Sequence, residues 1–211
     1  MQKFSQTLFA QTPVVGILRG YNQAQVLQIV AVYHAAGFTN IEITMNTPNA
    51  LNIIAAVAKA YAGKLNVGAG TVLSIAEVDA VLAAGGQFIV SPVTDIAVIR
   101  HCKVKNIPIF PGAYTPTEIY QAWRAGASMV KVFPARDLGP NYIADVLAPL
   151  DEMQLMPTGG VTKENIATYL KAGAKAFGMG VYLFNQQLIE AADWGKLRTH
   201  FDDFKRLLTN V

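Results

Sequence analysis

Ser128-Met129-Val130-Lys131-Val132-Phe133-Pro134 is the stretch from which both the fold and the chemistry of this chain can be worked out. Its β-branched and aromatic residues, bounded by Gly126 and Pro134, predict a β-strand. A strand that is apolar on both sides is typical of a parallel sheet covered by helices. Lys131 therefore lies in a predicted core, where lysine is rarely found without a partner. Burial disfavours its charged form, and a neutral amine attacks ketones to give a Schiff base. The alternative is a structural lysine that reaches a sheet end or pairs with a carboxylate.

The composition of the chain predicts a globular protein of the reducing cytoplasm. Its 211 residues are 52% hydrophobic and 15% charged, which allows a sizeable core. A single cysteine, Cys102, excludes an internal disulfide framework. No apolar run reaches the length of a membrane span, and the run 14–18 is too short for a signal-peptide core. The net charge of +3 comes from scattered basic residues, so we expect no nucleic-acid partner.

Strand-like and helix-like segments alternate along the rest of the chain. The predicted strands begin 20 to 27 residues apart, near Val14, Ile41, Asn66, Phe88, Pro108, Met129, Gln154 and Ala176. Helical patterns fill the gaps, for example Asn22–Ala36, Asn49–Tyr61, Ile75–Ala84 and Thr117–Ala125, and a short helix within residues 1–12 precedes them. Eight such units predict a closed parallel (β/α)8 barrel, a TIM barrel, formed by residues 1–211 as a single domain. An open doubly wound sheet is the alternative, and the near-equal units favour closure.

An Ala-Gly pair recurs before every second predicted strand. The pairs are Ala36-Gly37, Ala84-Gly85, Ala125-Gly126 and Ala172-Gly173. Glycine supplies the left-handed residue that ends a helix, and alanine lets that end lie close to the sheet. The repeat therefore corresponds to a quarter of a barrel. Segments 186–190 and 194–208 are predicted to close the chain as helices.

The carboxyl ends of the strands are where a barrel carries its active site. Arg19 ends the first strand and is suited to hold a carboxylate or phosphate, although it could simply begin a surface loop. Glu42 lies well inside the second strand, where a carboxylate needs a partner. Strands two and six face each other across an eight-stranded ring, so Glu42 and Lys131 can point into the same layer. A purely structural ion pair is the alternative.

Small and hydroxyl-bearing residues occupy the other predicted strand ends. Thr71 follows Gly68-Ala69-Gly70, and Pro92 follows the fourth strand. The loops after strands seven and eight are rich in glycine and open onto helix starts, the usual phosphate site of a barrel; the first helix start is predicted at 162–164. The three histidines lie away from strand ends, so we expect no metal site.

These motifs together resemble the KDPG/KHG aldolase family, the 2-keto-3-deoxy-6-phosphogluconate and 4-hydroxy-2-oxoglutarate aldolases. The resemblance covers about residues 13–183 and rests on five stretches: Ile41-Glu42-Ile43-Thr44, Val67-Gly68-Ala69-Gly70-Thr71-Val72-Leu73, Val90-Ser91-Pro92, Val130-Lys131-Val132-Phe133-Pro134-Ala135 and Pro157-Thr158-Gly159-Gly160. It implies a homotrimeric class I aldolase, an aldehyde-lyase of the barrel fold that works without metal or other cofactor.

The resemblance also implies a role for each matching residue. Lys131 matches the Schiff-base lysine and Glu42 the general acid/base. Residues that match the lining of the keto-acid pocket are Thr71, Pro92, Phe133 and Thr158. Residues that match the phosphate end are Gly159, Gly160, Gly178 and Gly180.

Two departures from the family pattern bear on the substrate. Asn46 stands where the gluconate-type aldolases have a carboxylate-binding arginine. The presence of Arg19 and of Leu138-Gly139-Pro140 is instead similar to the galactonate-type members, the 2-dehydro-3-deoxy-6-phosphogalactonate (KDPGal) aldolases, which implies that Arg19 binds the carboxylate. Val181 replaces a serine that follows the strand-eight glycines, so one phosphate hydrogen bond is lost unless Arg136 compensates.

The sequence therefore predicts cleavage of a 2-keto-3-deoxy sugar acid, with a 6-phosphate, to pyruvate and an aldehyde such as glyceraldehyde 3-phosphate. A sugar-phosphate isomerase or synthase, and a non-catalytic keto-acid binding protein, are the alternatives. The sequence leaves open which epimer is used and whether the phosphate is required.

Overall fold

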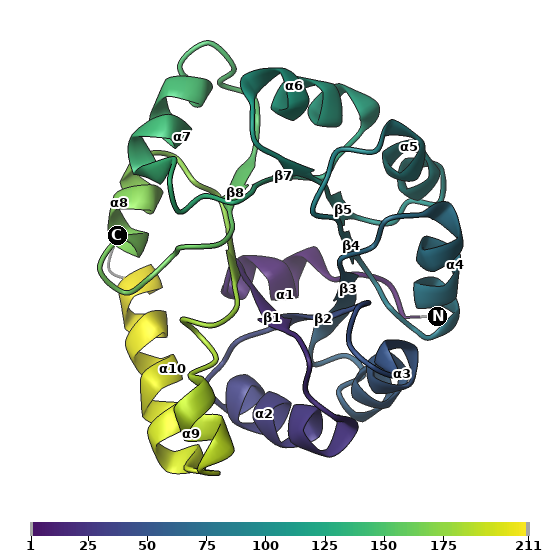
Figure 1. Ribbon diagram of the computed structural model, residues 1–211, viewed down its shortest axis with the longest axis vertical. Helices are drawn as coiled ribbons and strands as arrows, with labels where there is room; N and C mark the ends of the chain where they lie inside the picture. Colours follow the sequence, from purple (N-terminus) through teal and green to yellow (C-terminus); the bar gives the residue numbers. More distant parts are fainter. Residues whose placement is uncertain (1, 210–211) are drawn as a thin grey trace.

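The computed structural model describes residues 2–209, in which strands and helices alternate along the chain (Figure 1). The strands are β1 (Val14–Leu18), β2 (Asn40–Thr44), β3 (Asn66–Gly70), β4 (Ile89–Val90), β5 (Ile109–Phe110), β6 (Gly112–Ala113), β7 (Val130–Val132), β8 (Leu155–Pro157) and β9 (Phe177–Met179). The helices are α1 (Gln6–Gln11), α2 (Gln23–Ala35), α3 (Ala50–Ala60), α4 (Ile75–Ala83), α5 (Ile96–Val104), α6 (Pro116–Ala125), α7 (Gly139–Leu147), α8 (Ile166–Lys171), α9 (Gln186–Glu190) and α10 (Trp194–Thr209).

All strand pairs are parallel, and the strands form two sheets with the orders β5-β4-β3-β2-β1-β9 and β6-β7-β8. Only Pro111 separates β5 from β6, where the missing amide of proline interrupts the ladder. Thr158, directly after β8, makes a parallel bridge with Gly178 of β9. The sheet is thus strongly curled, with α2 to α10 around its outside (Figure 1).

Two apolar clusters fill the two sides of this sheet. The larger one lies under the helices and includes Val130, Val132, Ile41 and Ile43. The smaller one lies inside the curl and consists of Phe9, Val15, Phe88, Val90, Phe110, Met129, Met156 and Ala176. Because successive side chains of a strand point to opposite faces, residues that alternate with the first cluster point into the interior.

Helix α1 covers the amino-terminal end of the interior. The Ser5 N–H donates to Asn66 Oδ1 over 2.8 Å, and Asn66 Nδ2 donates back to the Ser5 carbonyl over 2.9 Å. Asn66 is the first residue of β3, so α1 is fixed where the strands begin. Phe4 and Phe9 then add their rings to those of Phe88 and Phe110. A ligand can therefore approach the interior from the carboxyl ends of the strands.

The four Ala-Gly pairs end helices as predicted. Gly37, Gly85, Gly126 and Gly173 have φ between +81° and +110°, the left-handed region in which glycine meets no Cβ penalty. The predicted helix start at 162–164 differs from the structure, in which α8 begins at Ile166. Asn165 explains the delay, because its Oδ1 accepts the Thr162 N–H and its Nδ2 donates to the Gly160 carbonyl.

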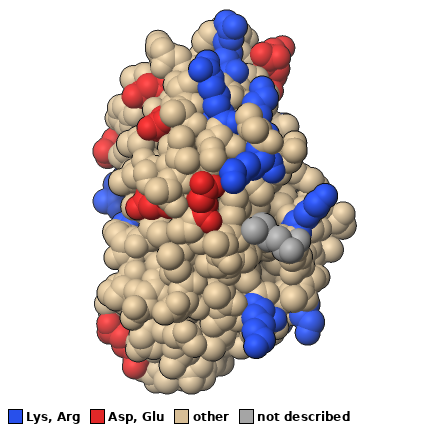
Figure 2. All heavy atoms as spheres, turned by 90° about the vertical axis from the view of Figure 1, so that its right-hand side faces the viewer, with Lys and Arg blue, Asp and Glu red and all other residues tan. Residues whose placement is uncertain are grey.

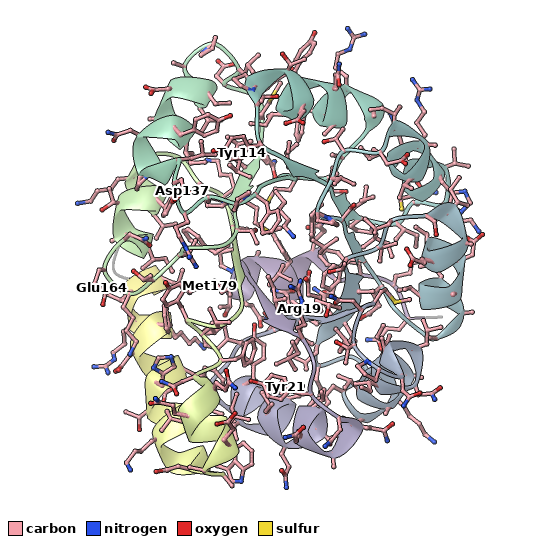
Figure 3. All side chains as sticks on the ribbon, in the orientation of Figure 1. Arg19, Tyr21, Tyr114, Asp137, Glu164 and Met179 are labelled. Carbon is pink, nitrogen blue, oxygen red and sulfur yellow. The ribbon has the colours of Figure 1, made fainter. Side chains whose placement is uncertain are left out.

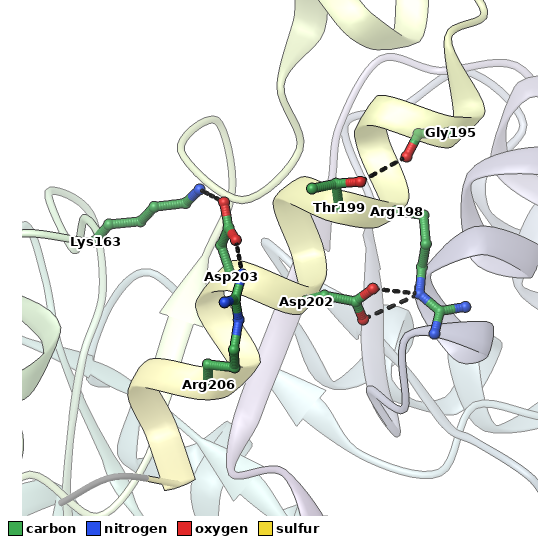
Figure 4. A network of polar contacts seen from close by, with 7 residues as sticks. All are labelled: Lys163, Gly195, Arg198, Thr199, Asp202, Asp203 and Arg206. Atoms are coloured by element: carbon green, nitrogen blue, oxygen red, sulfur yellow. Dashed lines mark hydrogen bonds and ion pairs between the residues drawn. The ribbon is translucent and has the colours of Figure 1, made fainter.

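Apart from Lys131 and Glu42, most charged side chains lie outside this framework. On the side formed by α4 and α5, most basic residues lie toward one edge and most acidic residues toward the other (Figure 2). Glu77 in the first turn of α4 and Lys103 in the last turn of α5 each complement the helix dipole. The ion pair of Lys163 with Asp203 attaches α10 to the segment before α8, and the pairs Asp203–Arg206 and Arg198–Asp202 lie within α10 (Figure 4). Within residues 2–209, no helix combines the length and the apolar character that crossing a membrane requires.

Candidate active site

Lys131 and Glu42 both point into the interior of the curled sheet. Lys131 alternates with Val130 and Val132 of the outer cluster, and Glu42 alternates with Ile41 and Ile43. Lys131 is only 5% exposed and Glu42 only 2%. The structure thus brings two ionisable groups from β7 and β2 into one interior, as the strand pattern predicts.

Burial moves the pKa of each group toward the neutral form. It raises the pKa of Glu42 from 4.5 to about 7, although the positive charges of Lys131 and Arg19 act to lower it. It also lowers the pKa of Lys131, although the Glu42 carboxylate acts to raise it and Arg19 lowers it further. Glu42 Oε2 has no hydrogen-bond partner among the described residues. A carboxyl group that titrates near neutrality beside a deprotonatable amine can carry out acid–base and Schiff-base chemistry.

Gly70 makes the position of Glu42 possible. A Cβ at Gly70 would lie 2.1 Å from Glu42 Oε1, well inside any contact distance, so only glycine leaves room for the carboxylate. From sequence, the small residues of this strand suggest room for a ligand. The structure gives Gly70 a second reason to be small, which the sequence does not reveal because it does not show that Glu42 and Gly70 lie on neighbouring strands facing the same way.

Arg19 lies directly after β1, near the middle of the molecule as seen along the curl (Figure 3). Its Nη2 donates to Thr71 Oγ1 over 3.4 Å, and Thr71 directly follows Gly70 at the end of β3. Two of the predicted site residues are therefore in contact. The guanidinium is close enough to shift the pKa of both Glu42 and Lys131.

A cavity of about 520 Å³ opens beside this group at the carboxyl ends of β1, β8 and β9. Arg136 and Val181 line this cavity. It also brings together six of the predicted site residues: Arg19, Thr158, Gly159, Gly160, Gly178 and Gly180. Gly178 must be small, because a Cβ there would lie 2.3 Å from Thr158 Oγ1. Arg136 thus contributes a cation to the cavity, and Val181, 76% exposed, contributes no hydrogen-bonding side chain.

Pro92 and Phe133 line a different cavity, of about 300 Å³, together with Gly112 and Tyr114. Phe133 nevertheless connects the two regions. Its ring centroid lies 4.6 Å from Lys131 Nζ, and a Cβ at Gly159 would lie 3.5 Å from its edge. Phe133 therefore contacts Lys131, while Lys131 and Glu42 themselves are among the lining residues of neither cavity.

Two of the three histidines have polar partners away from Lys131 and Glu42. His101 Nε2 lies 2.9 Å from Asp79 Oδ1, and His200 Nε2 lies 2.9 Å from the Tyr182 carbonyl. In the part of the chain that the structure describes, no three His, Cys, Asp or Glu side chains form a group that could hold a metal ion.

Comparison with known proteins shows which family this chain is similar to. The sequence model described as "KDPG and KHG aldolase" matches residues 6–199. A probable 2-dehydro-3-deoxy-6-phosphogalactonate aldolase of Rhizobium meliloti (strain 1021) is 40% identical over 82% of both chains. The 2-dehydro-3-deoxy-6-phosphogalactonate aldolase of Escherichia coli (strain K12) is 38% identical over 82% of this chain and 84% of its own. A solved structure described as native KDPGal superposes with a TM-score of 0.87 at 34% identity, over 98% of this chain and 97% of that chain.

Proposed function

Because the chain belongs to the KDPG and KHG aldolase family, we infer that it is a class I aldolase that cleaves a 2-keto-3-deoxy sugar acid to pyruvate and an aldehyde. The observation that carries this function is the buried pair of Lys131 and Glu42, since a lysine with a lowered pKa is the nucleophile that a Schiff-base mechanism needs. The names of the two relatives favour a 6-phosphorylated substrate and glyceraldehyde 3-phosphate as the aldehyde.

Lys131 starts the reaction in this proposal. Its neutral amine attacks carbon 2 of the keto acid, and loss of water leaves an iminium ion. When the bond between carbons 3 and 4 breaks, its electron pair moves into the iminium and gives an enamine. Protonation of carbon 3 and hydrolysis then release pyruvate and the free amine.

Glu42 moves the protons of these steps. Its carboxylate accepts the proton of the carbon 4 hydroxyl, directly or through a water, as the aldehyde forms, and then returns a proton to carbon 3 of the enamine. A pKa of about 7 suits both roles, because general acid–base groups work best near the operating pH. The unpartnered Oε2 supports this assignment, since it is the oxygen available to a substrate hydroxyl or a water.

The remaining site residues bind the substrate in this proposal. Arg19 holds the carboxylate of the keto acid, and Thr71, Pro92, Phe133 and Thr158 line its pocket. The backbone of Gly159, Gly160, Gly178 and Gly180 receives the phosphate end. Arg136, which lines the same cavity, supplies a cation where Val181 offers no hydroxyl.

We also propose that residues 1–211 form a single closed (β/α)8 barrel domain. The single-residue interruption at Pro111 and the bridge between Thr158 and Gly178 support closure of the two sheets into one ring. A cytoplasmic homotrimer without a cofactor completes the proposal, and equilibrium sedimentation at three times the chain mass would support the trimer.

Trapping with borohydride tests the function most directly. The protein is mixed with pyruvate, reduced, and examined by intact mass and peptide mapping. We expect a pyruvate-derived adduct on Lys131, none in Lys131→Ala, and cleavage of a KDPGal or KDPG substrate by the wild type only. A folded wild-type protein without an adduct would remove the amine mechanism and favour an isomerase acting on a sugar phosphate.

A further inference from the structure

The Arg19 side chain is weakly held by its own contacts. Its side chain is exposed, and its hydrogen bond to Thr71 Oγ1, at 3.4 Å, is long. A long flexible side chain loses conformational freedom when it binds a ligand, so the backbone that carries it must be fixed if the guanidinium is to be correctly aimed.

Thr47, from the loop after β2, holds the backbone directly after Arg19. The Gly20 N–H donates to Thr47 Oγ1 over 3.0 Å, and it is the first backbone amide after Arg19. Gly20 has φ +80°, a left-handed conformation open to glycine, and this hydrogen bond fixes the direction in which the chain leaves Arg19. Thr47 thereby joins the loop after β1 to the loop after β2.

Thr47 is itself firmly placed. It is 5% exposed, its N–H donates to the Thr44 carbonyl over 2.9 Å, and its hydroxyl lies 3.0 Å from the hydroxyl of Thr44, which is fully buried. Since Thr47 Oγ1 already accepts from Gly20, its own proton is free to go to Thr44 Oγ1. Thr44 stands two residues after Glu42 on the same strand and the same face.

We propose that Thr47 is a positioning residue for Arg19, and that the chain of contacts from Thr44 through Thr47 to Gly20 sets the affinity of the site for the carboxylate of its keto-acid substrate. The inference rests on the proposed function, because it takes Arg19 as the carboxylate ligand. It adds that the strand that carries the acid–base group also aligns the carboxylate clamp.

Thr47→Val tests the inference, because valine keeps the shape of threonine and removes only the hydroxyl. Thr47→Ser keeps the hydroxyl and should behave as the wild type. Thr39→Val is the matched control: Thr39 is also buried, and its hydroxyl donates to the Leu8 carbonyl at the opposite end of β2. Thermal unfolding of the three variants shows how much each loses in stability alone.

The readout compares two probes, pyruvate and its neutral methyl ester. The rate of borohydride-trapped adduct formation on Lys131 is measured for each at a concentration well below saturation. We expect Thr47→Val to slow trapping of pyruvate by about tenfold, the order expected when one hydrogen bond with a buried partner is lost. Trapping of methyl pyruvate, which has no carboxylate for Arg19, should change less than about twofold.

Equal slowing with both probes would overturn the inference, since it would show a general disturbance of the site. Trapping rates of Thr47→Val equal to those of Thr39→Val with both probes would also overturn it. If Thr47→Val does not fold, Thr44→Val, which removes the other hydroxyl of the chain, must show the same selective loss with pyruvate. A wild-type protein that forms no adduct with pyruvate would instead contradict the proposed function, so the two failures are distinguishable.

Discussion

Replacement of Gly70 by alanine is predicted to disable the site through a single methyl group. The new Cβ would lie 2.1 Å from Glu42 Oε1 and 2.6 Å from its Cδ. Non-bonded carbon and oxygen atoms keep about 3.5 Å apart, so the carboxylate must withdraw by about 1 Å or more. Its backbone cannot follow, because β2 is paired to β1 on one side and to β3 on the other. The side chain of Glu42 therefore has to leave its position.

The size of the effect follows from this displacement. A catalytic group that is misplaced by about 1 Å costs roughly 10²-fold in rate, so we expect kcat of Gly70→Ala to fall by at least that factor. The extra methyl group should also cost about 1–3 kcal/mol of stability. Release of pyruvate, coupled to NADH oxidation by lactate dehydrogenase, measures kcat. Trapping on Lys131 should remain detectable, because the amine itself is not in the way.

Gly68→Ala is the matched control, on the same strand and the same face. The three atoms nearest to its Cβ would belong to Phe88, at 2.6–2.7 Å, and not to Glu42, so it should destabilise the protein with a much smaller loss of kcat. A folded Gly70→Ala protein with the kcat of the wild type would refute the reasoning. Equal losses of kcat in the two variants would also refute it, since they would trace the effect to overpacking alone.

Four further predictions concern the buried ionisable groups. Glu42→Gln should lower kcat by roughly 10²–10⁴. The pKa of Glu42 is raised from 4.5 to about 7 in the folded state, so folding favours its protonated form. Its contribution to the free energy of unfolding is therefore fully present below pH 4.5 and is lost as the pH rises through about 7. Urea unfolding should therefore show the wild type losing up to about 3 kcal/mol relative to Glu42→Gln over this range, and parallel curves would contradict it. Lys131→Met should give no pyruvate adduct and an equal or higher melting temperature, because it fills the same volume without a buried amine; a lower one would show that the lysine stabilises the fold. Burial raises the pKa of the Cys102 thiol to about 12, so a disulfide reagent should modify it only at the rate of unfolding, and rapid modification of the native protein would contradict its burial.

The order of the elements follows from local features of the sequence. Each Ala-Gly pair marks a helix end because the left-handed glycine is a requirement of that one turn, and no distant contact is needed to recognise it. The strands are equally local, since apolar residues on both faces predict a strand covered on both sides. Lys131 and Glu42 are recognisable for the same reason, as single charged residues that interrupt such strands.

Features that depend on contacts between loops could not be predicted in this way. The hold of Thr47 on Gly20 joins two loops 27 residues apart. The delayed start of α8 depends on both polar ends of one asparagine side chain, Asn165, which no periodic pattern reveals. The distribution of the predicted pocket residues over two cavities, with Phe133 in one and Thr158 in the other, depends on side-chain directions that the alternation of a strand does not set at its end.

The charge of Arg19 gives the site a further property beyond binding. It lowers the pKa of both Glu42 and Lys131, so it favours the carboxylate of the one and the neutral amine of the other. These are the two forms in which the proposed mechanism begins, with Glu42 as base and Lys131 as nucleophile. Burial alone could not select both, because it neutralises the lysine but also protonates the glutamate. A cation at the strand ends corrects the second effect while it reinforces the first. A substrate carboxylate bound at Arg19 would offset part of that cation's charge and raise the pKa of Glu42, which would favour its acid form at the stage when a proton is needed to release water from the carbinolamine. The position of Arg19 therefore links binding of the keto acid to the protonation state of the groups that act on it.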